Sequence, residues 1–340
     1  MSASNAMRYL ADSTGDFGLS LKQYWGSCVE AFRDESILFD GSLNVIDRKS
    51  ITGTNSYQFL MMSDLPNSEE HTPGDELLGQ QFEVQDGTIT VDTILASHAD
   101  VPLDQMLQSH YDITGKLGPK QGKRLARDMD ARLFNLAITT ARSAAVTKNG
   151  LSIHNGGNRV TNSAVTVATR YPVSATGAQN FRADAANLAQ LMDEDFVPED
   201  NRYLMITPYI RRVLGMDTTI FDIRYGQNGS ENNLNKRVIG ELEGFKVMVA
   251  KGRIPSTVIS SYTQSKYNGN YLVTGTGEPV ALALCGAMDG SAAMGMVTLQ
   301  GIRTVGMADE RRNTFFLKAQ MLLGAGSLHP WCAGSIEVVP

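Results

Sequence analysis

The chain has 340 residues, of which 42% are hydrophobic, so it is long enough for about two domains of roughly 150 residues. Charged residues make up 19%, below the roughly 25% typical of soluble domains, as expected either where partners cover the surface or in a sparsely charged monomer. The formal net charge of −6 argues against a chain that binds nucleic acid over its whole surface.

Cysteine use and hydropathy argue against a disulfide-stabilised protein and against a membrane-spanning one. The 3 cysteines are odd in number, lie far apart and form no Cys-x-x-Cys pair, so we expect buried, reduced thiols at Cys28, Cys285 and Cys332. The most apolar window, 279–299, is interrupted by Asp289 and several glycines, which predicts buried strands and turns rather than a membrane span. The polar start, residues 1–9, lacks the apolar centre of a signal peptide.

Residues 1–56 are expected to form an arm with little core of its own. Ser20 can cap a helix whose apolar residues recur at helical spacing: Leu21, Tyr24, Trp25, Cys28, Val29 and Phe32. The flanking stretches, 1–18 and 34–56, are polar and rich in Gly, Ser, Asn and Asp. We expect this helix to pack either on the body of its own chain or on a neighbour.

The next segment predicts a long β-hairpin. Tyr57, Phe59 and Met61 alternate in direction with their neighbours, as in a strand, and a second strand is expected at 88–95, which is rich in Thr, Val and Ile. Acidic residues gather toward the distal end: Asp64, Glu69, Glu70, Asp75, Glu76, Glu83 and Asp86. Because an isolated two-stranded hairpin is marginally stable in water, this one requires another surface.

The strongest helical pattern follows at 118–145. Gly118-Pro119 indicates the start, with proline at the first helical position. One face is apolar, and the other carries basic residues in the first turns: Lys120, Lys123, Arg124 and Arg127. The helix dipole disfavours cations in a first turn by about 0.3–1 kcal/mol each. An anionic partner or plain solvation of this face can compensate, and both interpretations stay open.

Shorter elements fill the rest of the chain, and together with the hairpin and helix they indicate the α+β class. Helices are expected at 103–111, 181–192 and 208–215, and strands at 202–207, 244–251, 280–285, 298–305, 314–323 and 335–339. Residues 146–178 are rich in Ser, Thr, Asn and Gly, which predicts a long loop or a weak hairpin.

No pattern of catalytic residues stands out. The 5 histidines are widely spaced, and no HExxH, GxSxG, phosphate-binding loop or GxGxxG motif occurs. Glu69, Glu70 and His71 could contact a metal, but solvated loop charges are the simpler interpretation. We therefore expect a protein that is not an enzyme and that uses no metal or cofactor.

The segregation of charge along the chain is the most informative feature. Residues 50–115 contain no lysine or arginine but 11 aspartates and glutamates. In 116–148 the sign reverses, with eight basic residues against Asp128 and Asp130. Exposed ion pairs contribute only about 0–1 kcal/mol to a monomer, whereas complementary charges orient association and select partners. The pattern predicts head-to-tail self-association.

The order of arm, acidic hairpin, long basic helix, compact module and return strands resembles the major capsid protein of tailed bacteriophages, with its Hong-Kong-97-type fold. Three stretches are similar to the short-tailed podovirus group: His110-Tyr111-Asp112; Phe196-Val197-Pro198 with Asp200-Asn201-Arg202 and Thr207-Pro208; and Gly324 to Pro330 with Ala333-Gly334 and 336–339. The likeness covers nearly the whole chain, from Phe17 to Val339.

This resemblance implies a structural role. Copies would associate into pentamers and hexamers of an icosahedral shell that encloses double-stranded DNA. The implied parts are an N-terminal arm (1–56), an extended loop (57–102), a peripheral domain (103–198) with a spine helix at 118–145, an axial domain (199–297) and return strands to the peripheral domain (298–340). The acidic residues of the loop would contact the four basic residues of a neighbour's spine helix.

The resemblance also implies partners. Besides its own copies, the chain would meet a portal protein, decoration proteins, packaged DNA without sequence readout, and a separate scaffolding protein, because the arm is too short to include a built-in scaffold. It would act in the virion capsid, assembled in the host bacterial cytoplasm without a membrane. Some members join subunits by an isopeptide bond from a lysine of this loop, and here the loop has no lysine.

Three alternatives stay open. A nanocompartment shell protein of the same fold would enclose cargo enzymes instead of a genome. A metal-dependent hydrolase would use Glu69, Glu70 and His71. A monomeric nucleic-acid-binding module would use Lys120 to Arg127. Particle formation, metal content and DNA binding at physiological salt distinguish these classes.

Overall fold

The computed structural model describes residues 16–39, 43, 45–63, 68, 70–72, 74, 76, 79–102, 104, 113–199, 201–217, 240–286, 292–309 and 311–340. Its helices are α2 (Asp16–Glu35), α4 (Ile113–Ala141), α5 (Val167–Arg170), α6 (Ala175–Glu194) and α7 (Pro208–Leu214), with 3-10 turns η1 (Ser265–Tyr267) and η2 (Pro330–Cys332). Its strands are β1 (Ile46–Ser50), β2 (Ser56–Met62), β3 (Val84–Thr90), β4 (Thr93–Pro102), β5 (Val146–Lys148), β6 (Leu151–His154), β7 (Asn158–Ser163), β8 (Arg202–Ile206), β9 (Glu241–Leu242), β10 (Phe245–Val249), β11 (Glu278–Cys285), β12 (Met294–Asp309), β13 (Thr314–Ser327) and β14 (Ala333–Val339).

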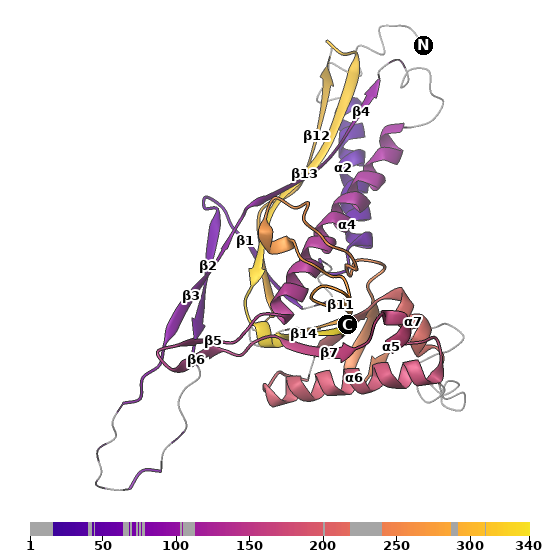
Figure 1. Cartoon of the computed structure of the whole chain (residues 1–340). Coiled ribbons are helices and arrows are strands. Elements are labelled where there is room, and N and C mark those ends of the chain that lie inside the picture. Colours follow the sequence, from indigo (N-terminus) through magenta and orange to yellow (C-terminus); the bar gives the residue numbers. More distant parts are fainter. Residues whose placement is uncertain are drawn as a thin grey trace, which may run out of the picture.

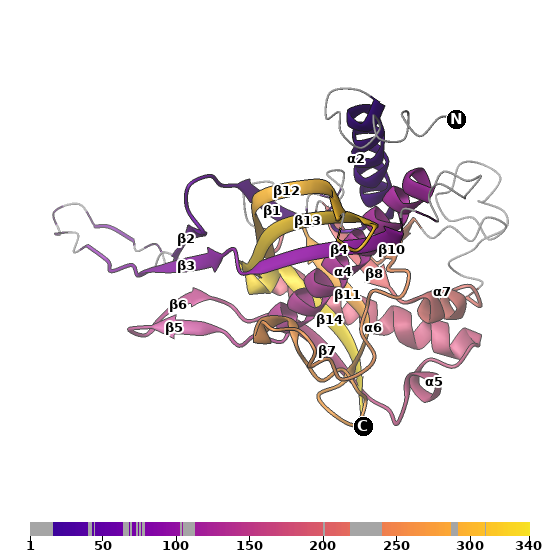
Figure 2. The same ribbon diagram turned by 90° about the horizontal axis from the view of Figure 1, so that it is seen from above.

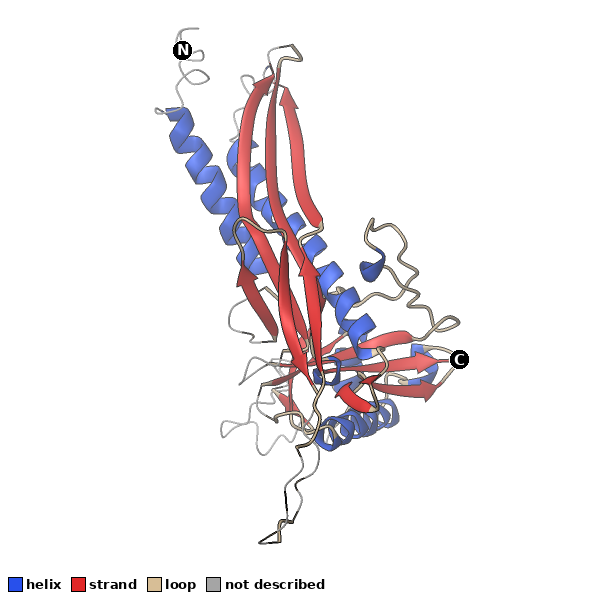
Figure 3. Cartoon of the chain, turned by 90° about the vertical axis from the view of Figure 1, so that its left-hand side faces the viewer, coloured by secondary structure: helices blue, strands red, loops and turns tan. Residues whose placement is uncertain are grey.

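The first sheet, in the order β1-β12-β13-β4, forms a long layer with two helices. Alternate residues of β13 are buried, as expected for a strand with one covered face: Phe315, Leu317, Ala319 and Met321. Figure 3 shows α2 and α4 running alongside the long strands, and both helices contact this sheet. The predicted arm helix therefore packs on the body of its own chain.

Helix α4 lies earlier in the chain than predicted, at Ile113–Ala141 instead of 118–145. Pro119 lies inside the helix, so its interpretation as the first helical residue is wrong. Gly118 and Gly122 instead face α2, because a Cβ on Gly122 would lie 2.2 Å from the carbonyl oxygen of Cys28. The glycines therefore permit a close approach of two helices.

The predicted hairpin is present, but its second strand is β3 rather than 88–95. The N–H of Val91 donates to the carbonyl of Asn55 (2.7 Å) and closes the base of the hairpin. The chain then turns, and β4 joins β13 in the first sheet. The strand predicted at 88–95 is therefore divided between β3 of the hairpin and β4 of the first sheet. Figure 2 shows the β2–β3 hairpin standing out from the side of the molecule.

The second sheet, in the order β7-β14-β11-β8-β10-β9, contains most of the remaining predicted strands. Its central strand β8 is fully buried at Leu204, Met205 and Ile206, as is typical of a strand covered on both faces. The predicted start of α7 is confirmed, because the Thr207 side chain accepts a hydrogen bond from the N–H of Ile210 and Pro208 opens the helix. Figure 1 shows α6 and α7 alongside this sheet.

Residues 146–178 are more regular than predicted, because they contain the β5–β6 hairpin, β7 and α5. β7 pairs in parallel with the last strand, β14, which also pairs with β11. The expected ranges 199–297 and 298–340 therefore both contribute strands to the second sheet, while β12 and β13 belong to the first. The domain boundaries themselves stay a prediction. The helix expected at 103–111 lies almost entirely outside the described residues.

One cluster of buried apolar side chains joins the two layers, and Phe134 of α4, Leu282 of β11 and Met321 of β13 all belong to it. The 3 cysteines are buried and none of them is in a disulfide, which agrees with their predicted role as small apolar residues. Burial raises the pKa of the Cys28 thiol to about 11. No helix within the described residues is long and apolar enough to cross a membrane.

Candidate subunit interface

The acidic residues predicted for the extended loop fall into two groups. Glu70, Glu76, Glu83 and Asp86 lie among the described residues, whereas Asp64, Glu69 and Asp75 lie outside them. Glu70, Glu76 and Asp86 are exposed, and within the described part of the chain none of them forms an ion pair. These three carboxylates are therefore accessible to a partner.

Glu83 differs, because the β5–β6 hairpin of the same chain binds it. Its carboxylate lies 3.1 Å from the ammonium of Lys148 and accepts a hydrogen bond from the Asn149 side chain at 2.7 Å. Lys148 also donates to the carbonyl of Val84 at 3.0 Å. The hydrogen bonds from Asn149 and Lys148 lower the pKa of Glu83. Glu83 therefore stabilises the position of the hairpin within its own subunit.

A second anchor lies at the base of the hairpin. Asp92 follows β3 and forms an ion pair of 2.6 Å with Lys266 of η1. Ile51, Ile89, Val297 and Leu328 form a small buried cluster beneath the same base. The hairpin is therefore held at its base by apolar and charged contacts and, at Glu83, by the β5–β6 hairpin.

The hairpin also exposes large apolar side chains, which the sequence analysis missed. Leu60 is 64% exposed, Met62 is 53% exposed and Phe82 is 52% exposed. In the β2–β3 register Leu60 lies opposite Asp86, so Leu60, Met62 and the carboxylate of Asp86 lie on one face. The signal was present, because apolar residues at 60 and 62 as well as at 57, 59 and 61 predict a strand that is covered on both faces.

Of the four basic residues predicted for the interface on α4, two form ion pairs within the chain and two are exposed to solvent. Arg124 pairs with Asp128 at 3.0 Å, and Arg127 pairs with Glu35 of α2 at 3.0 Å. Lys120 and Lys123 are exposed, and the described residues offer them no carboxylate partner within ion-pair distance. Only part of the predicted basic face is thus free for another molecule.

Behind this face lies a buried junction of α2, α4 and the turn after β10. Asp130 of α4 is fully buried and accepts hydrogen bonds from the N–H of Ile37 (2.9 Å) and the hydroxyl of Ser36 (3.2 Å). The guanidinium of Arg253 lies 3.6 Å from Asp130 and 2.9 Å from Glu35. Burial raises the pKa of Asp130 to about 6, whereas the hydrogen bond from Arg253 lowers the pKa of Glu35.

A second buried ion cluster lies at the carboxyl end of α4. Glu337 of β14 is fully buried between Arg142 (2.8 Å) and Arg159 (2.6 Å). Arg142 also donates to the carbonyls of Asn270 (3.2 Å) and Gly277 (3.0 Å), so it fastens the loop before β11 to α4. Both clusters join elements within one subunit.

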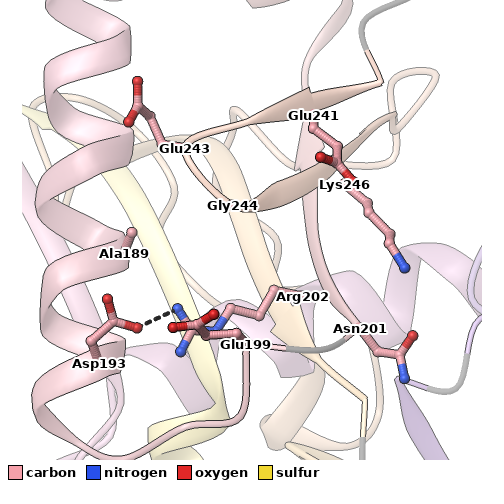
Figure 4. A pocket seen from close by; sticks show the side chains of 9 residues that line it. All are labelled: Ala189, Asp193, Glu199, Asn201, Arg202, Glu241, Glu243, Gly244 and Lys246. Carbon is pink, nitrogen blue, oxygen red and sulfur yellow. Dashed lines mark ion pairs between the residues drawn. The ribbon is translucent and has the colours of Figure 1, made fainter. Parts of the chain in front are cut away.

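The residues considered for metal chemistry lie between β2 and β3 in the sequence. No group of three His, Cys, Asp or Glu residues in it could hold a metal ion. Of the three residues considered for a hydrolase, Glu69 lies outside the described residues, and Glu70 and His71 are exposed. A hollow of about 420 Å³ lies between α6 and the β9–β10 turn, lined mainly by charged side chains (Figure 4). Its Arg202 pairs with Asp193 at 2.7 Å.

Solved structures with the same arrangement are subunits of viral and virus-like shells. The capsid of cyanophage P-SCSP1u matches with a TM-score of 0.72 at 22% identity, over 86% of each chain. The mature capsid of bacteriophage PhiM1 matches with a TM-score of 0.71 at 14% identity, over 89% of this chain and 87% of that one. The virus-like particle of Pyrococcus furiosus matches at 0.53 and 11%, over 93% and 98%. The fold is thus the α+β, Hong-Kong-97-type capsid fold.

The family follows from the sequence. Residues 59–337 match the model of the Gp10A-like family, a family of major capsid proteins. This chain therefore belongs to the Gp10A-like major capsid protein family. No curated protein matches it in sequence. It is a structural shell protein of a tailed phage and not an enzyme, as the resemblance implied.

Proposed function

We propose that copies of this chain form the pentamers and hexamers of an icosahedral shell that encloses double-stranded DNA. The observation that carries the proposal is the match of residues 59–337 to a major capsid protein family. The projecting hairpin supports it, because Leu60, Met62 and Phe82 expose apolar area that another copy can bury. The short-tailed phage type stays a prediction.

The proposed contact joins the extended loop of one copy to the spine helix of its neighbour. The exposed carboxylates Glu70, Glu76 and Asp86 would meet Lys120 and Lys123, which have no carboxylate partner among the described residues. The other two basic residues of the prediction, Arg124 and Arg127, contribute less because each already pairs within its own chain. Apolar burial, at about 25 cal/mol per Å², supplies most of the affinity, and the charges select the register.

The remaining partners follow from this role. A separate scaffolding protein directs assembly in the host bacterial cytoplasm, a portal protein occupies one vertex, and decoration proteins bind the finished shell. Packaged DNA meets a chain of net charge −6, so its contacts are local phosphate neutralisations without sequence readout. The loop supplies no lysine for an isopeptide bond, because residues 50–115 contain none.

A charge-swap experiment tests the loop-to-spine contact. Lys120→Glu together with Lys123→Glu should lower the yield of particles at least about tenfold, while the melting temperature of the subunit stays unchanged because neither lysine has an ion pair to lose among the described residues. Adding Glu70→Lys and Glu76→Lys in the same chain should restore particles. Lys251→Glu, another exposed lysine, is the control.

Electron microscopy and sedimentation of expressed protein measure the outcome. Normal particle yield from the double lysine variant would remove these residues from the interface. Wild-type protein that stays monomeric with its scaffold would contradict the shell function itself. The nanocompartment and hydrolase alternatives are not favoured, because the matching family is one of capsid proteins.

A further inference from the structure

Phe196, at the carboxyl end of α6, is exposed and held in an unfavourable backbone conformation. Its side chain is 94% exposed, more than that of any other large apolar residue among the described ones. Its φ is +55°, in the left-handed region that glycine usually occupies after a helix. The N–H of Val197 donates to the carbonyl of Met192 (3.0 Å), which closes the helix end in the usual manner with phenylalanine at the glycine position.

A single exposed apolar side chain is ordinary on a protein surface. Phe196 differs because the segment beneath it is rigid. Arg202 of β8, which is buried, donates to the carbonyls of Val197 and Pro198 and pairs with Asp193 at 2.7 Å. Figure 4 shows the Arg202 guanidinium beside Asp193 and Glu199. The segment on both sides of Phe196 is therefore fastened to the sheet.

A further hydrogen bond holds the residue that precedes Phe196. The Asn155 side chain, which follows β6, donates to the carboxylate of Asp195 at 3.0 Å. The aromatic ring is thus presented from a support that is already ordered, so little conformational entropy is lost when a partner covers it. A rigid, exposed aromatic residue with a polar rim has the features of an interface anchor.

The rim around the ring is acidic. Carboxylates flank Phe196 in the sequence on both sides, at Asp193, Glu194, Asp195 and Glu199, and two of them, Asp193 and Glu199, also line the hollow beside α6. A matching partner surface needs an apolar depression bordered by cations. A second copy of the chain offers exposed cations that the loop contact does not use, such as Arg33 on α2 and Arg303 on β12.

We propose that Phe196 is an assembly anchor that inserts into the surface of a second copy of this chain, with its acidic rim facing cations of that copy. The proposal rests on the shell function proposed above. The Phe196 contact is separate from the extended loop, because it lies at the carboxyl end of α6 (Ala175–Glu194). The left-handed backbone and the exposed side chain of Phe196 lower the stability of the free subunit. In the assembled shell this cost is offset, because the second copy buries the aromatic ring.

The test separates folding from assembly. Phe196→Gly should raise the melting temperature of the unassembled subunit by about 2 °C, because glycine adopts the left-handed conformation without strain. The same change should raise the protein concentration needed for particle formation at least about tenfold. Phe196→Trp should keep assembly, because a flat aromatic ring remains. Lys251→Gly is the matched control, since Lys251 is exposed with φ +44° and its replacement relieves similar strain away from the acidic rim.

Photo-crosslinking identifies the partner in assembled wild-type particles. With p-benzoylphenylalanine at position 196, the expected product is a dimer of the chain. Crosslinks only to another protein, or none, would overturn the proposal, as would normal assembly of Phe196→Gly. If wild-type chain forms no particles, the shell function fails instead, and that result is distinct from wild-type particles that tolerate Phe196→Gly.

Discussion

Replacement of Gly122 by alanine probes the contact between the arm helix and the spine helix. The added Cβ would lie 2.2 Å from the carbonyl oxygen of Cys28, whereas ordinary contacts begin near 3.4 Å. The carbonyl belongs to the backbone of α2 and cannot rotate away, so the two helices must separate by about 1 Å. A gap of that size removes roughly a quarter to a half of the dispersion attraction between facing atoms.

The energies decide the sign of the effect. Alanine in place of glycine inside a helix gains about 1 kcal/mol of helix propensity. Overpacking at a close contact costs about 1–3 kcal/mol, and the lost packing of Tyr24 and Cys28 against α4 adds to this cost. We expect Gly122→Ala to destabilise the docking of α2 by about 1–2 kcal/mol net. Gly118→Ala should cost less, because the nearest atom is the hydroxyl of Ser27, which can rotate.

Gly26 on α2 is the matched control, because a Cβ there meets nothing within 4 Å. Gly26→Ala should therefore stabilise α2 by about 1 kcal/mol. Hydrogen exchange of peptides from α2, measured on soluble subunits, reports both changes: faster exchange for Gly122→Ala and slower exchange for Gly26→Ala. Equal protection in both variants would refute the close approach of the two helices.

Two further predictions concern the buried ion clusters. Burial raises the pKa of Asp130 to about 6, so the folded chain binds a proton that the unfolded chain releases, and stability should rise by up to about 3 kcal/mol as pH falls from 6 toward 4. Asp130→Asn should remove this part of the pH dependence in urea denaturation, and an unchanged slope would contradict the assignment. Arg142→Met leaves the buried Glu337 with Arg159 and the Ser335 hydroxyl and should cost about 3 kcal/mol. Glu337→Gln in the same chain should recover part of that loss.

Local patterns predicted the local elements well. The helical spacing of apolar residues located α4 and α6, and Thr207 with Pro208 marked the start of α7 because capping depends on a few adjacent residues. The capsid resemblance was also accessible, because the order of elements and three short motifs belong to the chain itself. Pro119 was wrongly predicted as the first residue of the helix, because the sequence Gly-Pro occurs both at helix starts and, as here, where a glycine lets two helices approach closely.

The candidate interface was predicted only in part. Segregated charge indicated the loop and the spine, but it could not tell that Glu83 is bound by Lys148 or that Arg127 is bound by Glu35. Each of those pairs joins residues more than sixty positions apart, so the partner is chosen by the packing of whole elements. The need of the hairpin for another surface followed from its strand pattern, but only the structure shows that Leu60 and Met62 of β2 are exposed.

The sequence by itself determined the class of each element, the separation of acidic and basic segments, and the family to which the chain belongs, because these depend on spacing and order along the polypeptide. Only the tertiary structure decided which charges remain free for a second copy, where α2 and α4 touch, and that Phe196 lies exposed in a left-handed conformation on a support fastened by Arg202. Those features depend on distances between residues that are remote in the chain, and folding alone brings them together.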